Sequence, residues 1–490
     1  MKNKIIYILI LLYVIIAYLT IFNHLGSSPI KEFDEARLAV SAYEMSQGGN
    51  PLVVTFMNQP DLWNTKPPLL IWTQALFIKF FSLNETAVRL PSAIAMLMTG
   101  LLLLLFGVKI HKPYFGFLSS LILLCSWNVL FWHGGRTANY DSPLLLFITA
   151  YIISFWLYLQ DTTKHKYLIA FFIFLTLAAL TKDVQAFIAV PAIVLYTLSN
   201  KKLIPTLRSK YFWIGFGILT VFFFGFLFAR EMCVPGYLKA LWHNDIMGRY
   251  TQEIEYSPVG YGYYFSEFAE YTFKYFFFLL PFAFLFNLFN PDKEVKNLNI
   301  YALAIAIFYF SVITFGKTKL TWYSYPVVPM LCIIISLCID TLREYIEKNT
   351  DKTQRIFVYM FLFVLLFAKP LYENIFSSKG SFSVSYNHDV SYPHNDYIKL
   401  LYKHKNDILK NIPVLYVLNE EEHPDRLFYR CIFTSNGVDY VYKDIHDIPK
   451  GGTVMINFRD NTLIADSLYT YQELYNMNES KIIKIINKKQ

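Results

Sequence analysis

Long apolar runs recur along this chain, and they constrain its fold more than any other feature. A helix needs about 20 predominantly apolar residues to cross the hydrocarbon core of a bilayer. Eleven runs of roughly that length lie at residues 5–22, 88–107, 114–132, 142–159, 167–180, 185–199, 212–229, 265–289, 299–315, 322–341 and 356–370. Only 16% of the 490 residues are charged, below the quarter or so that is usual in soluble proteins. The sequence therefore predicts a polytopic α-helical membrane protein with about 11–13 spans.

The loops between these runs carry an alternating charge pattern. Basic residues gather on every second loop, as the positive-inside rule expects of cytoplasmic loops. These loops are residues 109–112, 164–166, 201–210, 293–296 and 343–355. We therefore interpret the net charge of +8 as a topology signal and expect no nucleic-acid partner. No small-residue cleavage site follows the first run, so we expect it to be a retained helix with its N-terminus in the cytoplasm.

One apolar stretch, residues 67–81, is predicted not to cross the membrane. A crossing there would place the basic residues 109–112 outside and reverse every later loop. The stretch is also short, begins with two prolines and contains Lys79. We expect juxtamembrane helices against the outer membrane face, within an outer loop that spans residues 23–86.

The composition changes after residue 370. Short apolar runs at 414–418 and 453–458 are bounded by Gly, Asn and Pro and read as strands, whereas residues 397–409 read as an amphipathic helix. We predict a transmembrane domain over residues 1–370 and a small C-terminal α/β domain over 371–490. An odd number of spans places this domain on the outer side of the membrane.

The charged residues that remain in short outer loops break the positive-inside rule. They are Asp34, Glu35, Arg37, Lys66, Arg136, Asp141, Lys182, Asp183, Arg249, Lys317 and Lys319. A charge at mid-membrane costs about 2.5–3.5 kcal/mol on insertion scales, and less near the surface, so the group needs compensation. Mutual salt bridges would supply it, and so would a polyanionic ligand. The slight excess of basic residues favours an anion such as phosphate.

Two motifs in the first outer loop allow a structural and a functional interpretation. One carboxylate of Asp34-Glu35 could be a general base, or both could favour the positive end of a helix dipole. Lys66-Pro67-Pro68 could bind a phosphate at a helix N-terminus, or Lys66 could be a snorkelling interfacial lysine. His243 and Asp245 are two candidate metal ligands without a third, and the cysteines predict no metal site, so no metal ligand is assigned.

These segments, in this order, resemble the GT-C superfamily of membrane glycosyltransferases over residues 1 to about 370. The group concerned is glycosyltransferase family 39-like and contains the protein O-mannosyltransferases and the undecaprenyl-phosphate-aminoarabinose lipid A transferases. Asp34-Glu35-Ala36-Arg37 is similar to the group's acidic motif in the first outer loop, and Lys66-Pro67-Pro68 is similar to its Lys-Pro element. Similar segments also fall at residues 89–91, 136–141, 181–183, 246–249 and 317–326.

The resemblance implies an inverting glycosyltransferase. Its donor would be a sugar on polyprenyl (undecaprenyl) phosphate, and its acceptor a lipid A-type glycolipid, another glycan or a protein hydroxyl on the outer face. The implied catalytic residues are Asp34, Glu35 and Asp141. The implied donor-phosphate ligands are Arg37, Lys66, Arg249 and Lys319, and the acceptor-binding or orienting residues are Arg136 and Lys182. The resemblance leaves a divalent cation possible and implies no other cofactor.

The chain departs from the aminoarabinose enzyme at two places. Thr65 stands where that enzyme has a carboxylate, and Asn244-Asp245 stands where it has Glu-His, which removes support for a metal site and for a lipid A acceptor. The alternative functions are a transporter or flippase of lipid-linked sugars and a membrane-anchored binding protein. Transporters more often carry charges at mid-membrane, so charges confined to the loops of one face favour an enzyme.

Overall fold

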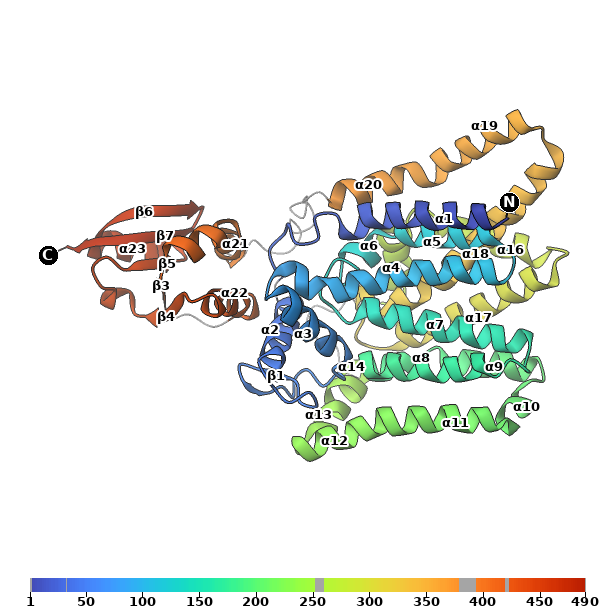
Figure 1. Ribbon diagram of the computed structural model, residues 1–490, viewed down its shortest axis with the longest axis horizontal. Helices are drawn as coiled ribbons and strands as arrows, with labels where there is room; N and C mark the ends of the chain where they lie inside the picture. The colour runs from blue at the N-terminus through green and yellow to red at the C-terminus, as the bar shows by residue number, and fades with distance from the viewer. Residues whose placement is uncertain (1, 32, 252–259, 379–393, 419–422, 490) are drawn as a thin grey trace.

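The computed structural model describes residues 2–31, 33–251, 260–378, 394–418 and 423–489. A bundle of roughly parallel and antiparallel helices forms one body, and a small sheet domain lies at one end of it (Figure 1). This is the predicted architecture of a polytopic helical protein with a C-terminal α/β domain.

Within the part of the chain that the structure describes, eight helices are long and apolar enough to cross a membrane. Three are single α-helices: α4 (Glu85–Lys109), α7 (Asp141–Gln160) and α17 (Lys293–Phe315). The other five combine α1 (Lys2–Ala17) with η1 (Tyr18–Phe22), α8 (Lys166–Lys182) with η2 (Asp183–Phe187), α11 (Lys210–Leu219) with η3 (Thr220–Phe224) and α12 (Gly225–Cys233), η7 (Thr321–Val327) with α18 (Val328–Asn349), and α19 (Lys352–Phe363) with η8 (Val364–Ala368) and α20 (Lys369–Ser378). Each coincides with one of the predicted spans.

The other three predicted spans are not long straight helices. Residues 265–289 fall on a pair of helical segments, Tyr263–Thr272 and Phe277–Leu288, that meet at an angle of 113°. Residues 114–132 and 185–199 contain the shorter helices α5 (Pro113–Leu124), α6 (Trp127–Phe131) and α9 (Val190–Ser199). Apolar composition predicts burial but not straightness, because a helix can break at membrane depth where protein covers the backbone. Most residues of α5 are buried in this way.

Short helices complete the described part of the bundle. They are α10 (Leu203–Arg208), α13 (Tyr237–Leu241), η4 (Trp242–Met247), α14 (Gly248–Thr251), α15 (Tyr263–Glu267), η5 (Phe268–Thr272), η6 (Phe277–Leu279) and α16 (Leu280–Leu288).

Loops that the sequence predicts to be cytoplasmic meet at one end of the bundle. Lys112 Nζ lies 3.3 Å from Glu344 Oε1 and 3.5 Å from Asp292 Oδ2. The N-terminus lies at this end, and the sheet domain lies at the opposite end (Figure 1). The two chain ends are therefore on opposite sides of the bundle.

The predicted outer loop forms a small cap at the end nearer the sheet domain. It contains α2 (Asp34–Ser46), a hairpin of β1 (Thr55–Phe56) and β2 (Gln59–Pro60), and α3 (Leu69–Phe81) (Figure 1). The 13 residues of α3 span about 20 Å at 1.5 Å per residue, too short for a hydrocarbon core of about 30 Å. The helix packs against α2 and α4, which agrees with a stretch that does not cross.

The C-terminal domain is a five-stranded mixed sheet with three helices. Its strands are β3 (Val414–Leu418), β4 (Asp439–Lys443), β5 (Thr453–Ile456), β6 (Tyr469–Met477) and β7 (Ser480–Lys488), in the order β4-β3-β5-β7-β6. The helices are α21 (His394–Asn411), α22 (Pro424–Ser435) and α23 (Arg459–Leu468), with η10 (Ile445–Asp447). The predicted strands and helix are present. The last long helix continues to Ser378, and the domain boundary at residue 370 stays a prediction.

The sheet domain docks on the outer loop through specific contacts. Glu85, at the start of α4, accepts hydrogen bonds from Lys405 Nζ at 2.7 Å and from the Tyr429 hydroxyl at 3.1 Å. The Tyr402 hydroxyl donates to the Gly26 carbonyl at 2.9 Å. Buried apolar residues of α2 and α22 belong to one continuous core. The sheet domain is therefore held against the outer loop by these polar contacts and by a shared apolar core.

Candidate functional site

The Asp34 carboxylate lies at the N-terminus of α2 and is open to ligands. Phe33, directly before it, has a φ of 62°, a left-handed conformation that is uncommon for a residue with a side chain. The Asp34 side chain is 38% exposed, and its Oδ2 lies 3.9 Å from His133 Nδ1. This separation is too long for a hydrogen bond, so Asp34 keeps acceptor capacity for a ligand.

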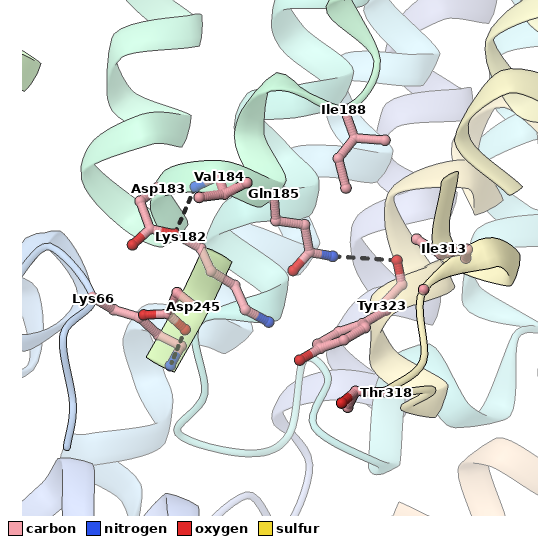
Figure 2. A pocket seen from close by; sticks show the side chains of 11 residues that line it. Lys66, Lys182, Asp183, Val184, Gln185, Ile188, Asp245, Ile313, Thr318 and Tyr323 are labelled. Atoms are coloured by element: carbon pink, nitrogen blue, oxygen red, sulfur yellow. Dashed lines mark hydrogen bonds and ion pairs between the residues drawn. The ribbon is translucent and has the colours of Figure 1, made fainter. Parts of the chain in front are cut away.

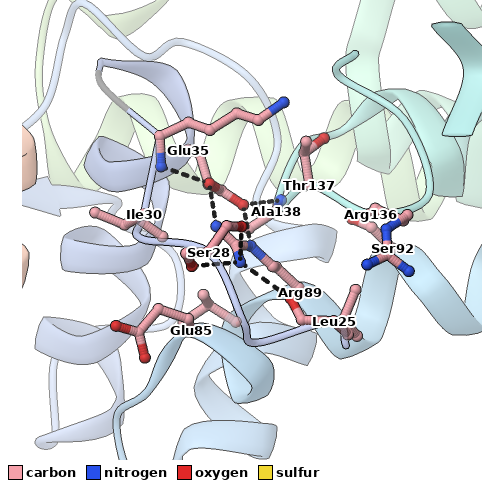
Figure 3. Close-up of polar contacts among 12 residues, drawn as sticks. Leu25, Ser28, Ile30, Glu35, Glu85, Arg89, Ser92, Arg136, Thr137 and Ala138 are labelled. Atoms are coloured by element: carbon pink, nitrogen blue, oxygen red, sulfur yellow. Dashed lines mark hydrogen bonds and ion pairs between the residues drawn. The ribbon is translucent and has the colours of Figure 1, made fainter. Parts of the chain in front are cut away.

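Glu35, unlike Asp34, is buried and forms an ion pair with Arg89. Its side chain is 1% exposed, and Oε1 and Oε2 lie 2.8 and 3.0 Å from Arg89 Nε and Nη2. The backbone amides of Lys31 and Ala138 donate to the same carboxylate (Figure 3). Burial alone would raise the pKa of Glu35, but Arg89, Lys31 and these hydrogen bonds together lower it. Glu35 therefore stays ionised and is fully used by protein donors.

His133 is a neutral partner of the open carboxylate. Burial, together with the nearby ammonium groups of Lys31 and Lys182, holds its pKa well below the usual value. Its imidazole stacks on the Trp322 indole with 3.6 Å between ring centroids. The stacking fixes the ring beside Asp34 without adding a positive charge.

A partly open pocket lies beside these residues. Lys66, Lys182, Asp183 and Asp245 contribute its charged groups, and Tyr323 and Thr318 lie on the opposite wall (Figure 2). Lys66 lies just before α3 in the outer loop and Lys182 is the last residue of α8, so residues over 100 positions apart meet here. We call this cavity the lysine pocket.

The two lysines are held with different strength. Lys182 Nζ lies 2.7 Å from Asp141 Oδ1, and both side chains are buried. Lys66 is 14% exposed, and its Nζ lies 3.7 Å from Asp245 Oδ1, a loose contact in which the ammonium keeps donors for a ligand. Asp34 and Lys66 both act electrostatically on Asp141, so the open carboxylate, the ion pair and the pocket form one charged cluster.

Arg230 holds the loop that carries Lys66 in place. Its guanidinium donates to the carbonyls of Asp61, Asn64, Thr65 and Lys66 at 3.0–3.4 Å. The Tyr237 hydroxyl also donates to the Thr65 carbonyl, at 2.8 Å.

Sequence reasoning missed the contribution of Arg230. The signal was present, because a basic residue directly follows the predicted apolar span at 212–229, and such residues are rare near hydrocarbon and need partners.

Besides Asp34 and Asp141, four predicted site residues with described side chains do not line the lysine pocket. Arg37 forms a two-point pair with Asp61, at 2.9 and 3.0 Å, and so holds the outer loop. Arg136 donates to the carbonyls of Thr20, Ile21, His24 and Ser378. Burial lowers the pKa of Arg136 to about 9. Lys319 Nζ donates to the Gly316 carbonyl at 2.9 Å, and Glu35 pairs with Arg89. Their predicted roles stay predictions.

Arg249 cannot be assigned to the pocket. It lies on α14, and its side chain is outside the described residues. Its predicted role in phosphate binding therefore stays a prediction too.

Comparison with solved structures gives proteins of similar fold. ArnT from Cupriavidus metallidurans bound to undecaprenyl phosphate is 15% identical, with a TM-score of 0.70, and the match covers 97% of each chain. The Archaeoglobus fulgidus oligosaccharyltransferase is 11% identical, with a TM-score of 0.51, over 89% of this chain and 64% of that one. Both are GT-C glycosyltransferases.

Sequence comparisons agree with the similarity in fold. A family model described as dolichyl-phosphate-mannose-protein mannosyltransferase matches residues 65–228. An uncharacterized protein of Aquifex aeolicus (strain VF5) is 26% identical over 373 residues, which are 75% of this chain and 70% of that protein. The resemblance to the GT-C glycosyltransferases is confirmed.

The two departures from the GT-C aminoarabinose enzyme meet in space. The Thr65 hydroxyl donates to Asp245 Oδ2, and Asp245 also lies against Lys66. Among the residues that the structure describes, no three His, Cys, Asp or Glu side chains group together as metal ligands. The possible divalent cation stays untested.

Proposed function

We propose that this protein is an inverting glycosyltransferase that moves a sugar from a polyprenyl phosphate to an acceptor on the outer face of the membrane. The observation that carries the proposal is the half-open carboxylate of Asp34 beside the lysine pocket. An enzyme of this class needs a base for the acceptor hydroxyl and fixed cations for the leaving phosphate. The GT-C fold, and the undecaprenyl phosphate named with ArnT, support this class of donor.

The reaction follows from the positions of Asp34 and Lys66. Asp34 accepts the proton of the acceptor hydroxyl, whose oxygen forms a bond to the anomeric carbon. The bond from that carbon to the phosphate oxygen breaks on the opposite side, and its electron pair leaves with the phosphate. Lys66 stabilises the negative charge that develops there, because a preorganised cation in a partly buried pocket needs little rearrangement.

The ion pair of Lys182 and Asp141 has a positioning role in this proposal. Both groups are buried and 2.7 Å apart, so each largely neutralises the other. We infer that the pair fixes the wall of the lysine pocket next to Asp34, and that this fixed wall helps to orient the acceptor hydroxyl against Asp34.

The proposed side of the membrane is the periplasmic side of a bacterial inner membrane. The end of the bundle with Asp34 and Lys66 is opposite the end with the basic loops, which supports this orientation. Reporter fusions after Lys164 and after Asn411 test it. We expect a cytoplasmic signal for the first and a periplasmic signal for the second, and signals from the same side would overturn the topology.

The acceptor can be found by mass spectrometry of envelope lipids and glycoproteins. We expect a sugar adduct that is lost in a deletion strain, returns with the wild-type gene and stays absent with Asp34→Asn. Western blotting of membranes must show equal amounts of both proteins. An adduct that returns with Asp34→Asn would exclude Asp34 as the base. Its mass would distinguish a lipid A-type glycolipid, another glycan and a protein hydroxyl.

A further inference from the structure

A second cavity lies on the other side of the segment that closes the lysine pocket. Its walls include Trp127, Trp132, Tyr263, Glu267 and Glu270, and we call it the glutamate pocket. Glu270 is exposed at its mouth. The residues come from α6 and the following loop and from the bent pair of helices, so the sharp bend that shortens the predicted span forms one wall of the cavity.

Glu267 supplies an unusual buried group to this pocket. The residue is 5% exposed, and its Oε1 accepts hydrogen bonds from Asn128 Nδ2 at 2.7 Å and Thr272 Oγ1 at 2.5 Å. Its Oε2 is also buried and has no hydrogen-bond partner among the residues that the structure describes. A buried polar atom without a partner is costly, so Oε2 is suited to a ligand that brings a donor.

The rest of the wall indicates what kind of donor fits. Glu267 and Glu270 are among the described lining residues and no Lys or Arg is, so these residues offer a phosphate no cation. Four indole or phenol rings line the cavity, from Trp127, Trp132, Tyr263 and Tyr271, and the face of such a ring carries a negative quadrupole. A sugar ring matches both features, because its C–H groups carry slight positive charge and its hydroxyls donate to carboxylates.

The walls are fixed before any ligand binds. Trp127 Nε1 donates to Ser377 Oγ at 3.3 Å, and the hydroxyls of Tyr263 and Thr321 lie 2.8 Å apart. The Tyr325 hydroxyl donates to the carbonyls of Asn128 and Trp132 at 3.1 and 2.5 Å. A pocket with fixed walls loses little entropy on binding a ligand.

The glutamate pocket is connected to Asp34 through consecutive residues. Trp132 lines the pocket, and His133, next in the chain, lies 3.9 Å from Asp34. On the facing segment, Thr321 lines the glutamate pocket, Trp322 stacks on His133, and Tyr323 lines the lysine pocket. Asp34 and the stacked rings therefore lie between a cavity with two lysines and a cavity with two glutamates.

We propose that the glutamate pocket binds a sugar ring of the acceptor, and that this ring carries hydroxyl or amino groups but no phosphate. The inference rests on the proposed function. It makes the acceptor a glycan or glycolipid rather than a protein hydroxyl. The donor phosphate enters the lysine pocket, the acceptor sugar enters the glutamate pocket, and the hydroxyl to be glycosylated reaches Asp34 between them.

Binding can be measured without transfer by saturation-transfer NMR on the purified full-length protein in detergent. The probes are the methyl glycosides of glucose, mannose, galactose and glucosamine. We expect saturable binding of at least one probe, weakened about threefold or more by Glu267→Gln, because a net hydrogen bond contributes about 0.5–1.5 kcal/mol. No saturable binding of any probe would overturn the proposal.

Two further variants guard this test against misfolding. Glu270→Gln changes an exposed side chain of the same pocket, so it keeps the fold, and we expect it to weaken binding about threefold or more. Glu347→Gln removes a carboxylate that pairs with Arg343 at the opposite end of the bundle, and we expect no effect. Equal affinity of the wild type and both pocket variants would overturn the proposal.

Competition distinguishes the acceptor sugar from the donor sugar. Glucose-loaded undecaprenyl phosphate is added at a concentration that displaces bound undecaprenyl phosphate. If the glutamate pocket binds the acceptor sugar, the methyl glycoside stays bound. If the loaded donor displaces the methyl glycoside, the glutamate pocket binds the donor sugar and the acceptor assignment is wrong. Sugar binding by a protein whose deletion removes no sugar adduct from envelope lipids, glycans or proteins would overturn the proposed function but leave the sugar site intact.

Discussion

Glu35 and Arg89 form a two-point buried ion pair, with Oε1 2.8 Å from Nε and Oε2 3.0 Å from Nη2. Arg89 also donates to the carbonyls of Leu25, Ser28 and Pro29. The pair thus joins the start of α2 to α4 and to the chain that leaves the first span. It fixes the position of the preceding carboxylate in the chain, that of Asp34, while leaving it open.

Asp34→Asn is expected to abolish sugar transfer without unfolding the protein. The asparagine has the same size, and the carboxylate it replaces is 38% exposed, so little packing is lost. Loss of a general base lowers rates by about 10²–10⁴-fold. Transfer to the acceptor found by mass spectrometry, measured in membranes with equal protein, checks this. A rate within threefold of wild type would remove Asp34 from catalysis.

Glu35→Gln is expected to act on stability first. The change leaves Arg89 buried without its counter-charge, and breaking one partner of a buried pair costs about 3–5 kcal/mol. Thermal unfolding in detergent should show a clearly lower midpoint than for Asp34→Asn, which serves as the matched neighbour. Equal midpoints for the two variants would contradict the assignment of Glu35 to a structural ion pair.

The sequence predicts the membrane fold, the non-crossing α3 and the tail domain because each depends on local composition. It also predicts that Asp34 and Lys66 belong to the site region, since both stand in an outer loop where charge is unexpected. The breaks near Ser126 and in the bent helix pair are not predicted, because an apolar run gives no sign of where neighbouring helices will cover an interrupted backbone.

The sequence also does not predict which side chains from distant segments contact each other in the site. Lys182 and Asp141 lie on successive spans, yet nothing in either motif specifies that they meet. Arg230 binds carbonyls of a loop more than 160 residues away, and backbone carbonyls carry no sequence signal. Glu267 lies in a predicted span but was not recognised, because its role depends on the walls around it.

Lys66→Ala is expected to weaken use of the lipid donor more than use of the acceptor. Lys66 is the more loosely held lysine of the pocket, so its ammonium can turn to a phosphate, and losing one charged contact costs about 1.5–3 kcal/mol. We expect KM for the donor to rise about tenfold or more with a smaller change for the acceptor. Lys79→Ala, on the surface of α3, is the control. An unchanged KM for the donor would reject the phosphate assignment.

The buried Lys31 should make the free energy of unfolding depend on pH between pH 7 and 10.5. Burial lowers the pKa of Lys31 from 10.5 to about 7, despite the opposing effect of Glu35. In this window the unfolded chain binds a proton that the folded protein does not, so stability rises with pH. Below pH 7 both states are protonated and the slope vanishes. We expect Lys31→Met to remove this part of the slope in thermal unfolding, and identical slopes in both proteins would contradict it.

Arg230→Met is expected to loosen the loop that carries Lys66, although Arg230 itself does not line the lysine pocket. The methionine fills similar space in α12 but leaves the carbonyls of Asp61, Asn64, Thr65 and Lys66 without their shared donor. The loop then holds Lys66 less firmly, so KM for the donor should rise while the acceptor response changes little. Arg208→Met, at the opposite end of the bundle, should leave both unchanged. Because Arg230 acts through Lys66, the double variant with Lys66→Ala should bind the donor no worse than Lys66→Ala alone. Additive losses would instead mean that Arg230 contacts the donor directly.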